Sequence, residues 1–522
     1  MNRSIATPQR HGSMTPDRRL FLKGVVAAGA SLAAPMSAVA DETPKKGGHL
    51  VVGLTGGETT NSLDPTLANA QAMFIMLGQY SERLILPARN GRDLEARLAE
   101  SWDHSTDLMT WTFKLRKGVT FHNGKTMTAK DAVFSLNRHR GANSKSGAAG
   151  SMGIVADIKA DGDNQFAVTL TEPRTDFPFI LTDYHIVVQP EGDPGDSGIG
   201  TGPYAINEAK HGVRYLTTKF KDYWQPNVGF VDSIETLVIN DNSARVSALI
   251  NGQVHLINRI EPKVVSLIAR APTARVVPAQ GRSHYVFAMR TDVAPFDNAD
   301  LRTALKLAID RPAMVKQILR GYGTVGNDTP INANYPLATS LEQRTYDPKE
   351  AARLYKKSGH AGPIILHTSE VAFGGAVDAA VLFKVQAAQA GITIEVQRDP
   401  GDGYWGNVWN KEPFCATYWD GRPSQQQMLG IAYKSDAPWN ETAWKWPAFD
   451  KLLADAGREP DDAKRTELYK AATTMVRDDG GAIIPMFTQY LDGVSNKVEG
   501  YVADPNNELS NARFQETCWL ES

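Results

Sequence analysis

The sequence predicts an α/β fold in which a mostly parallel β-sheet is covered by helices. Residues 362–397 read as strand, helix and strand in succession, which is the pattern of a βαβ unit. Helix-capping residues recur along the chain, at Thr128, Asn298 and Asp347. The 522 residues include 42% hydrophobic and 22% charged side chains, an ordinary composition for a globular protein. At roughly 100 to 200 residues per domain, this length favours two to four domains.

The first 40 residues predict an export signal. Arg18 and Arg19 precede a weakly apolar stretch, 25–34, and the small-x-small pattern at 38–40 is one that a signal peptidase accepts. The paired arginines resemble the twin-arginine class, which exports folded proteins. A cytoplasmic amphipathic helix is the alternative, although alanine, glycine and serine make a poor apolar face. We therefore expect cleavage after Ala40 and a periplasmic protein with no lipid anchor, because neither cysteine lies near the cleavage site.

The charge of the mature chain argues against several partners. Cleavage would leave about six more acidic than basic side chains. This net negative charge does not favour binding to nucleic acid or to an anionic membrane. No later apolar run approaches the ~20 residues that a membrane helix needs. No histidine pair has helical metal spacing and no Cys-x-x-Cys occurs, so we expect no cofactor and no dedicated metal site. Cys415 and Cys518 could form a disulfide or stay buried as separate thiols.

Periodicity and turn residues place the elements in order. An apolar strand bounded by glycines lies within 47–57, and alternation of Trp111, Phe113 and Leu115 with polar residues predicts a half-buried strand. A turn follows at 122–124.

Helices follow at four places. The predicted starts are Thr128 (with Asp131 at the third position), Asn298, Pro312 and Asp347, and the predicted stops of the last two helices are Gly321 and Gly359. The βαβ unit then completes a sheet whose ligands are expected at strand ends.

Four segments of the mature chain carry further information: 98–138, 200–204, 295–315 and 468–487. In order and spacing they resemble the extracytoplasmic solute-binding proteins, family 5, of ATP-binding-cassette (ABC) importers, which handle dipeptides, oligopeptides and nickel complexes. The resemblance covers nearly the whole mature chain.

The resemblance implies a type II periplasmic-binding-protein fold, with two lobes, three subdomains, a hinge and a ligand cleft. One lobe would comprise 41–284 and 488–522, with an inserted subdomain at roughly 85–200, and the other 285–487. Closure of the lobes would bury a solute on nearly all sides and signal occupancy to a membrane partner.

The hinge is predicted in two crossing segments, 285–289 and 483–487. The implied function is capture of a short peptide or other amine-bearing solute by a monomer, which delivers it to permease subunits in the inner membrane and catalyses no reaction. An oligosaccharide or opine-like ligand in the same role is the alternative.

Six of the ten tryptophans lie between residues 405 and 446. Cleft candidates in this stretch are Trp405, Trp409, Trp419 and Trp439, with Tyr404 beside them. Core packing explains any one of them equally well. Indoles that line a cleft could stack on a sugar or peptide side chain, or surround a cation.

Asp420 follows the predicted buried strand 415–419, before Gly421 and Pro423 break the chain. Peptide-binding members of the family use an aspartate here to pair with the amino group of the ligand, and the resemblance implies this role for Asp420. The sequence lacks the family's usual Asp-Pro, and the spacing differs by about one residue. A turn-capping aspartate is the alternative. Arg422 could bind an anionic ligand end or be an exposed loop arginine.

Weaker candidates are Thr59 and Asn61, which follow the first strand and could equally form a solvated loop, and His367, which ends a strand of the βαβ unit. The motif at 195–198, Gly-Asp-Ser-Gly, matches the nucleophile loop of trypsin-like proteases. A nucleophilic Ser197 would need a histidine and a buried acid to orient it, and no histidine stands in a recognisable protease signature. A glycine-rich turn is therefore favoured, with an exported hydrolase as the alternative.

Overall fold

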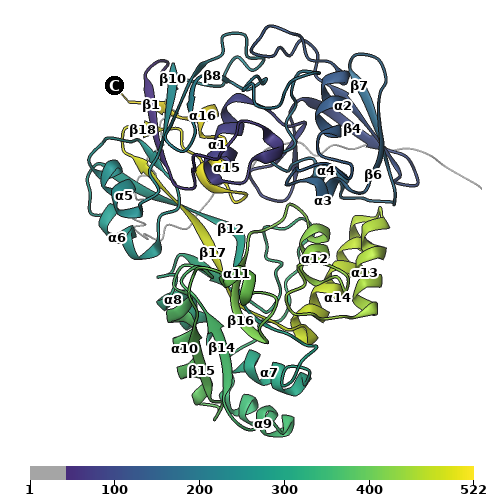
Figure 1. The fold of residues 1–522 in the computed structure, drawn as a ribbon, viewed down its shortest axis with the longest axis vertical. Coiled ribbons are helices and arrows are strands. Elements are labelled where there is room, and N and C mark those ends of the chain that lie inside the picture. Colours follow the sequence, from purple (N-terminus) through teal and green to yellow (C-terminus); the bar gives the residue numbers. More distant parts are fainter. Residues whose placement is uncertain (1–42, 522) are drawn as a thin grey trace, which may run out of the picture. The chain divides into compact units, whose positions relative to one another are not determined.

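An 11-stranded mixed sheet runs through residues 43–521, the part of the chain that the structure, a computed structural model, describes (Figure 1). Its order is β15-β14-β16-β12-β17-β11-β1-β10-β9-β8, and β13 pairs with β17. The predicted export signal lies outside the described residues. The strands of this sheet are β1 (His49–Leu54), β8 (Tyr204–Lys210), β9 (Arg214–Lys219), β10 (Ser233–Val238), β11 (Leu256–Ile257), β12 (Ala274–Met289), β13 (Gly323–Val325), β14 (Ile364–Thr368), β15 (Ile394–Arg398), β16 (Phe414–Trp419) and β17 (Ala482–Ser495).

A second, four-stranded antiparallel sheet has the order β4-β5-β7-β6. Its strands are β4 (Ala99–His104), β5 (Thr110–Leu115), β6 (Val155–Ala160) and β7 (Gln165–Leu170). The predicted alternation in β5 is confirmed, because Trp111, Phe113 and Leu115 are buried and the residues between them are not. Small two-stranded pairings join β2 (Ile85–Pro87) to β3 (Leu94–Ala96) and β18 (Val498–Glu499) to β19 (Trp519–Leu520).

Helices cover both sheets (Figure 1). Those of the N-terminal half and the C-terminal segment are η1 (Pro65–Leu67), α1 (Gln71–Tyr80), α2 (Ala129–Asn137), α3 (Ala149–Met152), α4 (Phe177–Ile180), α5 (Asn242–Ile250), η2 (Pro262–Val264), α6 (Val265–Ile268), α15 (Glu508–Ala512) and α16 (Phe514–Thr517). Those between β12 and β17 are α7 (Ala299–Leu307), α8 (Arg311–Gln317), α9 (Pro348–Ser358), α10 (Ala376–Ala388), α11 (Tyr404–Asn407), α12 (Gln425–Tyr433), α13 (Pro447–Arg458) and α14 (Asp462–Asp479).

The predicted helix starts are confirmed. Thr128 and Asp131 form a capping box at α2, and the side chains of Asn298 and Asp347 cap α7 and α9. One predicted stop is wrong: α8 ends at Gln317, not near Gly321. Its C-cap residue, Ile318, still has helical dihedral angles, and the left-handed conformation follows only at Arg320 (φ 50°) and Gly321 (φ 88°).

The predicted βαβ unit is confirmed. Strands β14 and β15 are parallel, with Ile364 opposite Ile394, and α10 forms the crossover between them. The buried strand predicted at 415–419 is also confirmed as β16, which pairs antiparallel with β12.

The hydrophobic cores fall into two groups. Two cores consist only of buried residues between Val286 and Phe487. The buried members of the other four cores come from residues 50–274 and 491–518. We call residues 43–284 with 488–521 lobe I and residues 285–487 lobe II, and these boundaries remain our proposal.

Strands β12 and β17 connect the lobes and pair with each other along most of their length (Figure 1). Their register shifts between Gln280 and His284 and again between Tyr285 and Phe287. The predicted hinge segments, 285–289 and 483–487, contribute buried side chains to the lobe II cores. The first shift leaves residues 281–283 outside the ladder, and the position of the hinge stays a prediction.

The motif Gly-Thr-Gly-Pro-Tyr at 200–204 forms the predicted turn and leads into β8. Both glycines pack against the end of α1, where a Cβ at Gly200 would lie 2.1 Å from the carbonyl oxygen of Tyr80. A Cβ at Gly202 would lie 2.6 Å from the carbonyl oxygen of Gln79. The backbone here approaches too closely for any side chain.

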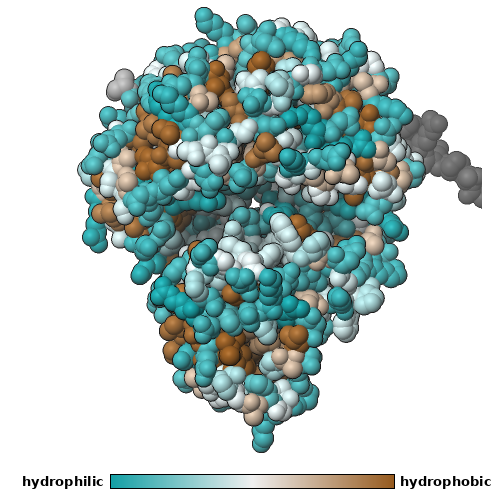
Figure 2. Space-filling model, viewed as in Figure 1, coloured by the Kyte–Doolittle hydropathy of each residue, from teal (hydrophilic) through white to brown (hydrophobic). Residues whose placement is uncertain are grey.

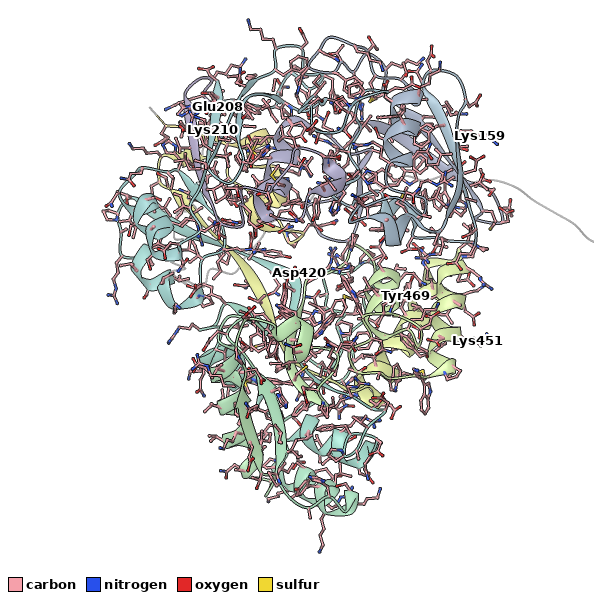
Figure 3. The ribbon with its side chains drawn as sticks, in the orientation of Figure 1. Lys159, Glu208, Lys210, Asp420, Lys451 and Tyr469 are labelled. Atoms are coloured by element: carbon pink, nitrogen blue, oxygen red, sulfur yellow. The ribbon has the colours of Figure 1, made fainter. Side chains whose placement is uncertain are left out.

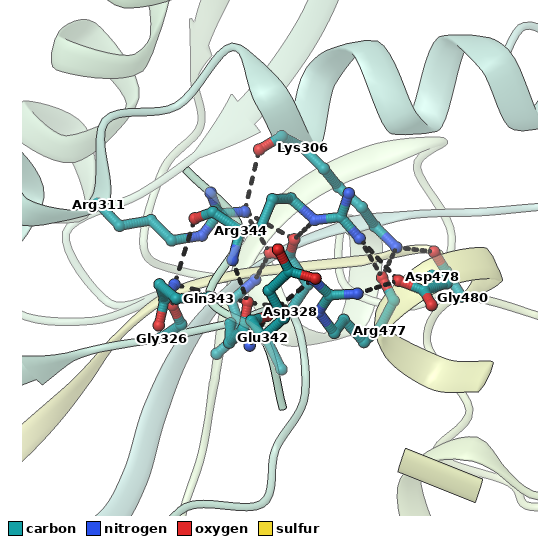
Figure 4. A network of polar contacts seen from close by, with 12 residues as sticks. Lys306, Arg311, Gly326, Asp328, Glu342, Gln343, Arg344, Arg477, Asp478 and Gly480 are labelled. Carbon is teal, nitrogen blue, oxygen red and sulfur yellow. Dashed lines mark hydrogen bonds and ion pairs between the residues drawn. The ribbon is translucent and has the colours of Figure 1, made fainter. Parts of the chain in front are cut away.

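A buried network of charges lies inside lobe II (Figure 4). The carboxylate of Asp328, which is fully buried, accepts hydrogen bonds from Arg311 at 2.6 and 2.7 Å and lies 2.9 Å from the guanidinium of Arg344. The ammonium of Lys306, also fully buried, donates to the carbonyl oxygens of Arg477 and Gly480. The network joins α7, α8 and the end of α14.

Candidate functional site

A cavity of about 1830 Å³ separates the two lobes, and Figure 2 shows the molecular surface hollowed between them. Nine Asp or Glu and nine Lys or Arg side chains line it. Drug-sized ligands fill pockets of roughly 300 to 1,000 Å³, so this cavity has room for a larger solute with its water. Because acidic and basic lining residues are equal in number, the cavity suits a solute that carries both a positive and a negative charge.

Asp420 lies at the cavity wall, directly after β16, and Figure 3 shows it at the gap between the lobes. One carboxylate oxygen accepts a hydrogen bond from the Ser283 hydroxyl at 3.2 Å, and that hydroxyl lies 3.2 Å from the hydroxyl of Tyr490. Among residues 43–521, no Lys, Arg or His nitrogen lies within 4.0 Å of the Asp420 carboxylate. The carboxylate therefore faces the cavity without a cationic partner.

Four tyrosines from both lobes line the cavity together with this carboxylate: Tyr184, Tyr285, Tyr418 and Tyr490. Burial raises the pKa of Tyr490, and the negative charge of Asp420 raises this pKa further. In Tyr184 of lobe I, burial, Asp183 and then Asp420 raise the phenol pKa. The charge of Asp420 thus acts across the cavity on the opposite lobe. Neutral phenol rings around a carboxylate offer π-faces to a bound cation.

Three of the predicted ligand-binding residues line the cavity: Asp420, Arg422 and Trp439. The guanidinium of Arg422 donates to the backbone carbonyl oxygen of Asp420 at 3.0 Å and lies over the Trp419 ring at 5.8 Å. Trp439 is 46% exposed. These residues come together at the C-terminal end of β16 and in the loop before α13.

The other aromatic candidates are not among the lining residues. Tyr404 is buried and donates its hydroxyl to the carbonyl oxygen of Ala416 at 2.7 Å. Trp409 and Trp419 donate their indole N–H groups to the two carboxylate oxygens of Glu441. Trp405 is 40% exposed and packs edge-on against Tyr418, which does line the cavity. These side chains support the cavity wall from behind.

Thr59, Asn61 and His367 also lie outside the cavity lining. Asn61 is buried and accepts a hydrogen bond from the backbone of Glu58, its neighbour that lines the cavity. Thr59 is exposed. His367 lies within lobe II, 3.0 Å from the carboxylate of Asp399.

Several lining residues were not predicted. Ser283 and Tyr490 belong to the strands that connect the lobes, and Glu508 and Asn511 belong to the C-terminal segment. No motif marks them in the sequence. The available signal was the alternation of side chains along β12 and β17. This alternation turns some of the side chains towards the cavity.

One edge of the cavity is bridged by contacts between the lobes. The Ser424 hydroxyl donates to the carboxylate of Asp176 at 2.6 Å, and both residues are buried. The backbone N–H of Thr175 donates to the carbonyl oxygen of Gly457 at 2.9 Å. These contacts join the start of α4 to α12 and α13 on the side away from β12 and β17 (Figure 1).

The Gly-Asp-Ser-Gly motif forms a turn. The Ser197 hydroxyl donates to the carboxylate of Asp193 at 2.5 Å and accepts from the backbone N–H of Ile199. His122 contacts the backbone of Gly200 and Gly202. Within residues 43–521, no histidine is hydrogen-bonded to Ser197. The serine is engaged in holding its own loop.

Three further observations concern the described part of the chain. Across residues 43–521, no three His, Cys, Asp or Glu side chains are grouped so that they could hold a metal ion. The same residues contain no helix with the length and apolarity of a membrane span. Cys415 and Cys518 are both buried and free, so they do not form the disulfide that the sequence left open.

The buried carboxylate of Glu441 predicts a pH-dependent contribution to stability. Burial raises its pKa from 4.5 to about 7, although the two indole donors oppose this rise. A raised pKa means that the folded protein holds the proton more tightly, so this stabilisation is complete below pH 4.5 and is lost as the pH rises through 7. We expect about 3 kcal/mol to be lost over this window.

Denaturant unfolding at pH 5 and pH 8 tests this expectation, with tryptophan fluorescence as the readout. In Glu441→Gln, which keeps an acceptor but cannot ionise, the pH-dependent difference should shrink by this amount. Equal pH dependence in the two proteins would contradict the assignment.

Known proteins provide three comparisons. The model for bacterial extracellular solute-binding proteins, family 5 (middle), matches residues 93–441. The dipeptide-binding protein of Escherichia coli strain K12 is 24% identical over 461 residues, which cover 78% of this chain and 83% of that protein. The di/tripeptide-binding protein 1 of Pseudomonas aeruginosa is 26% identical over 449 residues, which cover 79% and 82%.

A solved structure gives the same fold. The periplasmic binding protein DppA of Helicobacter pylori, in complex with the peptide STSA, matches with a TM-score of 0.74 at 23% identity. The match covers 92% of this chain and 99% of that one. The predicted fold class, α/β with two lobes and a cleft between them, is therefore confirmed.

Proposed function

Because this chain belongs to family 5 of the bacterial extracellular solute-binding proteins, we propose that it captures a short peptide or another amine-bearing solute and delivers it to the permease of an ABC importer. The relatives named for dipeptides and tripeptides support a peptide as the solute. Capture would occur in the cavity between the lobes, with bending at residues 280–284 of β12 and the facing part of β17.

The unpaired carboxylate of Asp420 is the observation that carries this proposal. It ends a buried strand, faces the cavity and has a hydroxyl as its neighbour. A primary ammonium would form a charge-assisted hydrogen bond with it, and the surrounding tyrosine rings would exclude water. A competitor without this ammonium would leave a carboxylate desolvated and unpaired, which is the source of discrimination.

Replacing Asp420 with asparagine is expected to weaken binding of di- and tripeptides by about 100-fold, which corresponds to about 3 kcal/mol. Isothermal titration of the wild-type and variant proteins with alanine di- and tripeptides measures this change. N-acetylation of the peptide should cause a similar loss in the wild type and little further loss in Asp420→Asn.

Glu370→Gln is the matched control, because Glu370 also lines the cavity and is exposed, as Asp420 is, but it pairs with the exposed Arg398. Its affinity should stay within a factor of about three, as expected when an exposed ion pair is removed. Undiminished affinity in Asp420→Asn would remove the proposed anchor.

A second candidate is the same role for an oligosaccharide or opine-like ligand. It is supported by Tyr418 and Trp439, which line the cavity and are 43% and 46% exposed. Exposed rings of this kind can stack on flat faces of a solute. Competition of such ligands against alanine peptides in the same titration distinguishes the two candidates, because only the favoured class should displace the other.

We further propose export by the twin-arginine route, cleavage after Ala40, and action as a periplasmic monomer without a cofactor. The support is the pattern of the first 40 residues together with membership of an extracellular family. Binding should proceed without turnover: a peptide recovered after incubation with the protein should be chemically unchanged.

A further inference from the structure

Arg83 is a buried cation at the cavity that has no acidic partner. Its side chain lines the cavity in lobe I, and the residue is 8% exposed. The guanidinium donates one hydrogen bond, to the carbonyl oxygen of Thr182 at 2.6 Å. Among residues 43–521, no Asp or Glu oxygen lies within 4.0 Å of it. In the same described part of the chain, Arg245 and Arg282 are also buried without an acidic partner, but each donates at least three hydrogen bonds to backbone carbonyl oxygens. Arg83 donates one, so its remaining donors require an explanation.

The neighbouring arginines have the acidic partners that Arg83 lacks. Arg97 contacts the carboxylates of Glu82 and Glu516 at 3.1 and 2.8 Å, and Arg513 forms a two-pronged pair with Glu95. Each cation near Arg83 is thus neutralised by acids of its own. The guanidinium of Arg83 shares this part of lobe I but has none.

Nearby acidic groups do not fill this gap. Asp183 is engaged by the imidazole of His185, at 2.6 Å, and it lies beyond ion-pair distance of Arg83. Burial, and after it the positive charge of Arg513, lowers the pKa of Arg83 to about 10. The group therefore keeps its charge at neutral pH while its surroundings favour the approach of an anion.

Arg83 and Asp420 belong to opposite walls of the same cavity. The carbonyl of Thr182, which accepts from Arg83, is two residues from Tyr184, and the phenol of Tyr184 is influenced by the charge of Asp420. Arg422, which the sequence suggested as a partner for an anion, lies beside Asp420 and donates to that residue's own carbonyl. It is therefore at the ammonium end of the cavity.

We propose that Arg83 binds a carboxylate of the solute, so that the ligand is a short zwitterion held between Asp420 in lobe II and Arg83 in lobe I. This inference rests on the proposed function and specifies its ligand class as a peptide-like solute with a free carboxylate. A ligand that joins the two walls by opposite charges stabilises the closed arrangement, because each charge loses its partner when the lobes separate.

The test compares alanine dipeptides and tripeptides with their C-terminal amides by isothermal titration. In the wild type, the free acid should bind about 30-fold more tightly than the amide, as expected for a charge-assisted hydrogen bond in a desolvated site. In Arg83→Gln, the acid should lose about 30-fold and the amide should change little, so the ratio falls towards one.

Two further variants make the result specific. Arg422→Gln should keep the preference for the acid, and Arg83→Lys, which retains the charge, should restore part of it. Arg458→Gln is the control for loss of a cavity-lining but exposed arginine, and it should keep the full preference. If Arg83→Gln does not fold, the wild-type ratio and Arg83→Lys still decide the matter.

The outcomes are distinguishable from those of the proposed function. Equal affinities for acid and amide in the wild type, or loss of the preference in Arg422→Gln, would overturn the role of Arg83 while leaving peptide binding intact. Failure of every peptide, acid or amide, to bind would overturn the proposed function and this inference with it.

Discussion

Replacing Asp328 with alanine should lower the free energy of unfolding by about 3 to 5 kcal/mol, the cost of leaving buried charges without their counterion. Asp328 is fully buried between Arg311 and Arg344, and the ammonium of Lys306 lies in the same network (Figure 4). Although burial opposes it, Arg311 holds the pKa of Asp328 below its ordinary value, so the carboxylate is ionised. Burial lowers the pKa of Lys306 to about 7, and Asp328 counteracts this effect.

Thermal unfolding followed by circular dichroism measures the effect. At roughly 2 to 4 °C per kcal/mol for domains of this size, the transition of lobe II should fall by about 10 °C. Asp328→Asn, which keeps the shape but not the charge, should be destabilised by a similar amount. The matched control is Asp436→Ala, which removes an exposed ion pair with Lys434 and should change stability by less than about 0.5 kcal/mol. Equal midpoints for Asp328→Ala and Asp436→Ala would show that the network contributes nothing.

Substitution of Gly200 by alanine is the second large expected effect, a destabilisation of about 3 kcal/mol, at the upper end for overpacking. The added Cβ would lie 2.1 Å from the carbonyl oxygen of Tyr80 and 2.9 Å from the Cα of Ser81. Both atoms are backbone, so no side-chain rotation relieves the clash. The end of α1 and the entry to β8 would have to separate.

Urea unfolding of Gly200→Ala against the wild type measures this cost. Gly406→Ala is the control, because a Cβ at Gly406 meets nothing within 4 Å and its backbone is not left-handed. Alanine is also the better helix former there, so this control should be neutral or slightly stabilising. A midpoint for Gly200→Ala equal to that of the control would mean that the chain accommodates the side chain without strain.

Local signals accounted for much of the fold. Caps at Thr128, Asn298 and Asp347, the alternation in β5 and the βαβ unit were all predictable, because each depends on residues within a few positions of one another. The end of α8 at Gln317 was missed, because the glycine that marks a stop lies four residues later and Gln317 itself gives no such signal. Family motifs supplied the two-lobe arrangement, which no local pattern contains.

The site was less predictable than the fold. Asp420 could be placed at the cavity because it ends a recognisable strand, and Trp439 because it belongs to a dense aromatic segment. The same aromatic segment also contains Trp409 and Trp419, whose indoles donate to Glu441 instead of lining the cavity. The sequence does not show which tryptophans of the segment face the cavity. Arg83 became notable only when the acids around it were seen to be paired with other arginines.

The C-terminal segment has a backbone conformation that local sequence does not predict. Leu509, Ser510, Asn511 and Ala512 all take left-handed backbone conformations, with φ between 48° and 60°. Such a conformation costs roughly 1 to 2 kcal/mol per residue for L-amino acids. Long-range contacts hold it, including a hydrogen bond from the backbone N–H of Leu509 to Asp492. Nothing in the local sequence could have indicated it.

The pairing of β12 with β17 has a consequence for how this protein can be divided. Tyr285, where lobe II begins, lies directly opposite Met486, near its end, so the two ends of the 285–487 segment are neighbours in one ladder. This segment also contains two complete hydrophobic cores. Both features support our proposal that this segment is a domain inserted into a host domain. Excision would require only a short linker across adjacent strands, and the same point offers a place to open the chain for circular permutation.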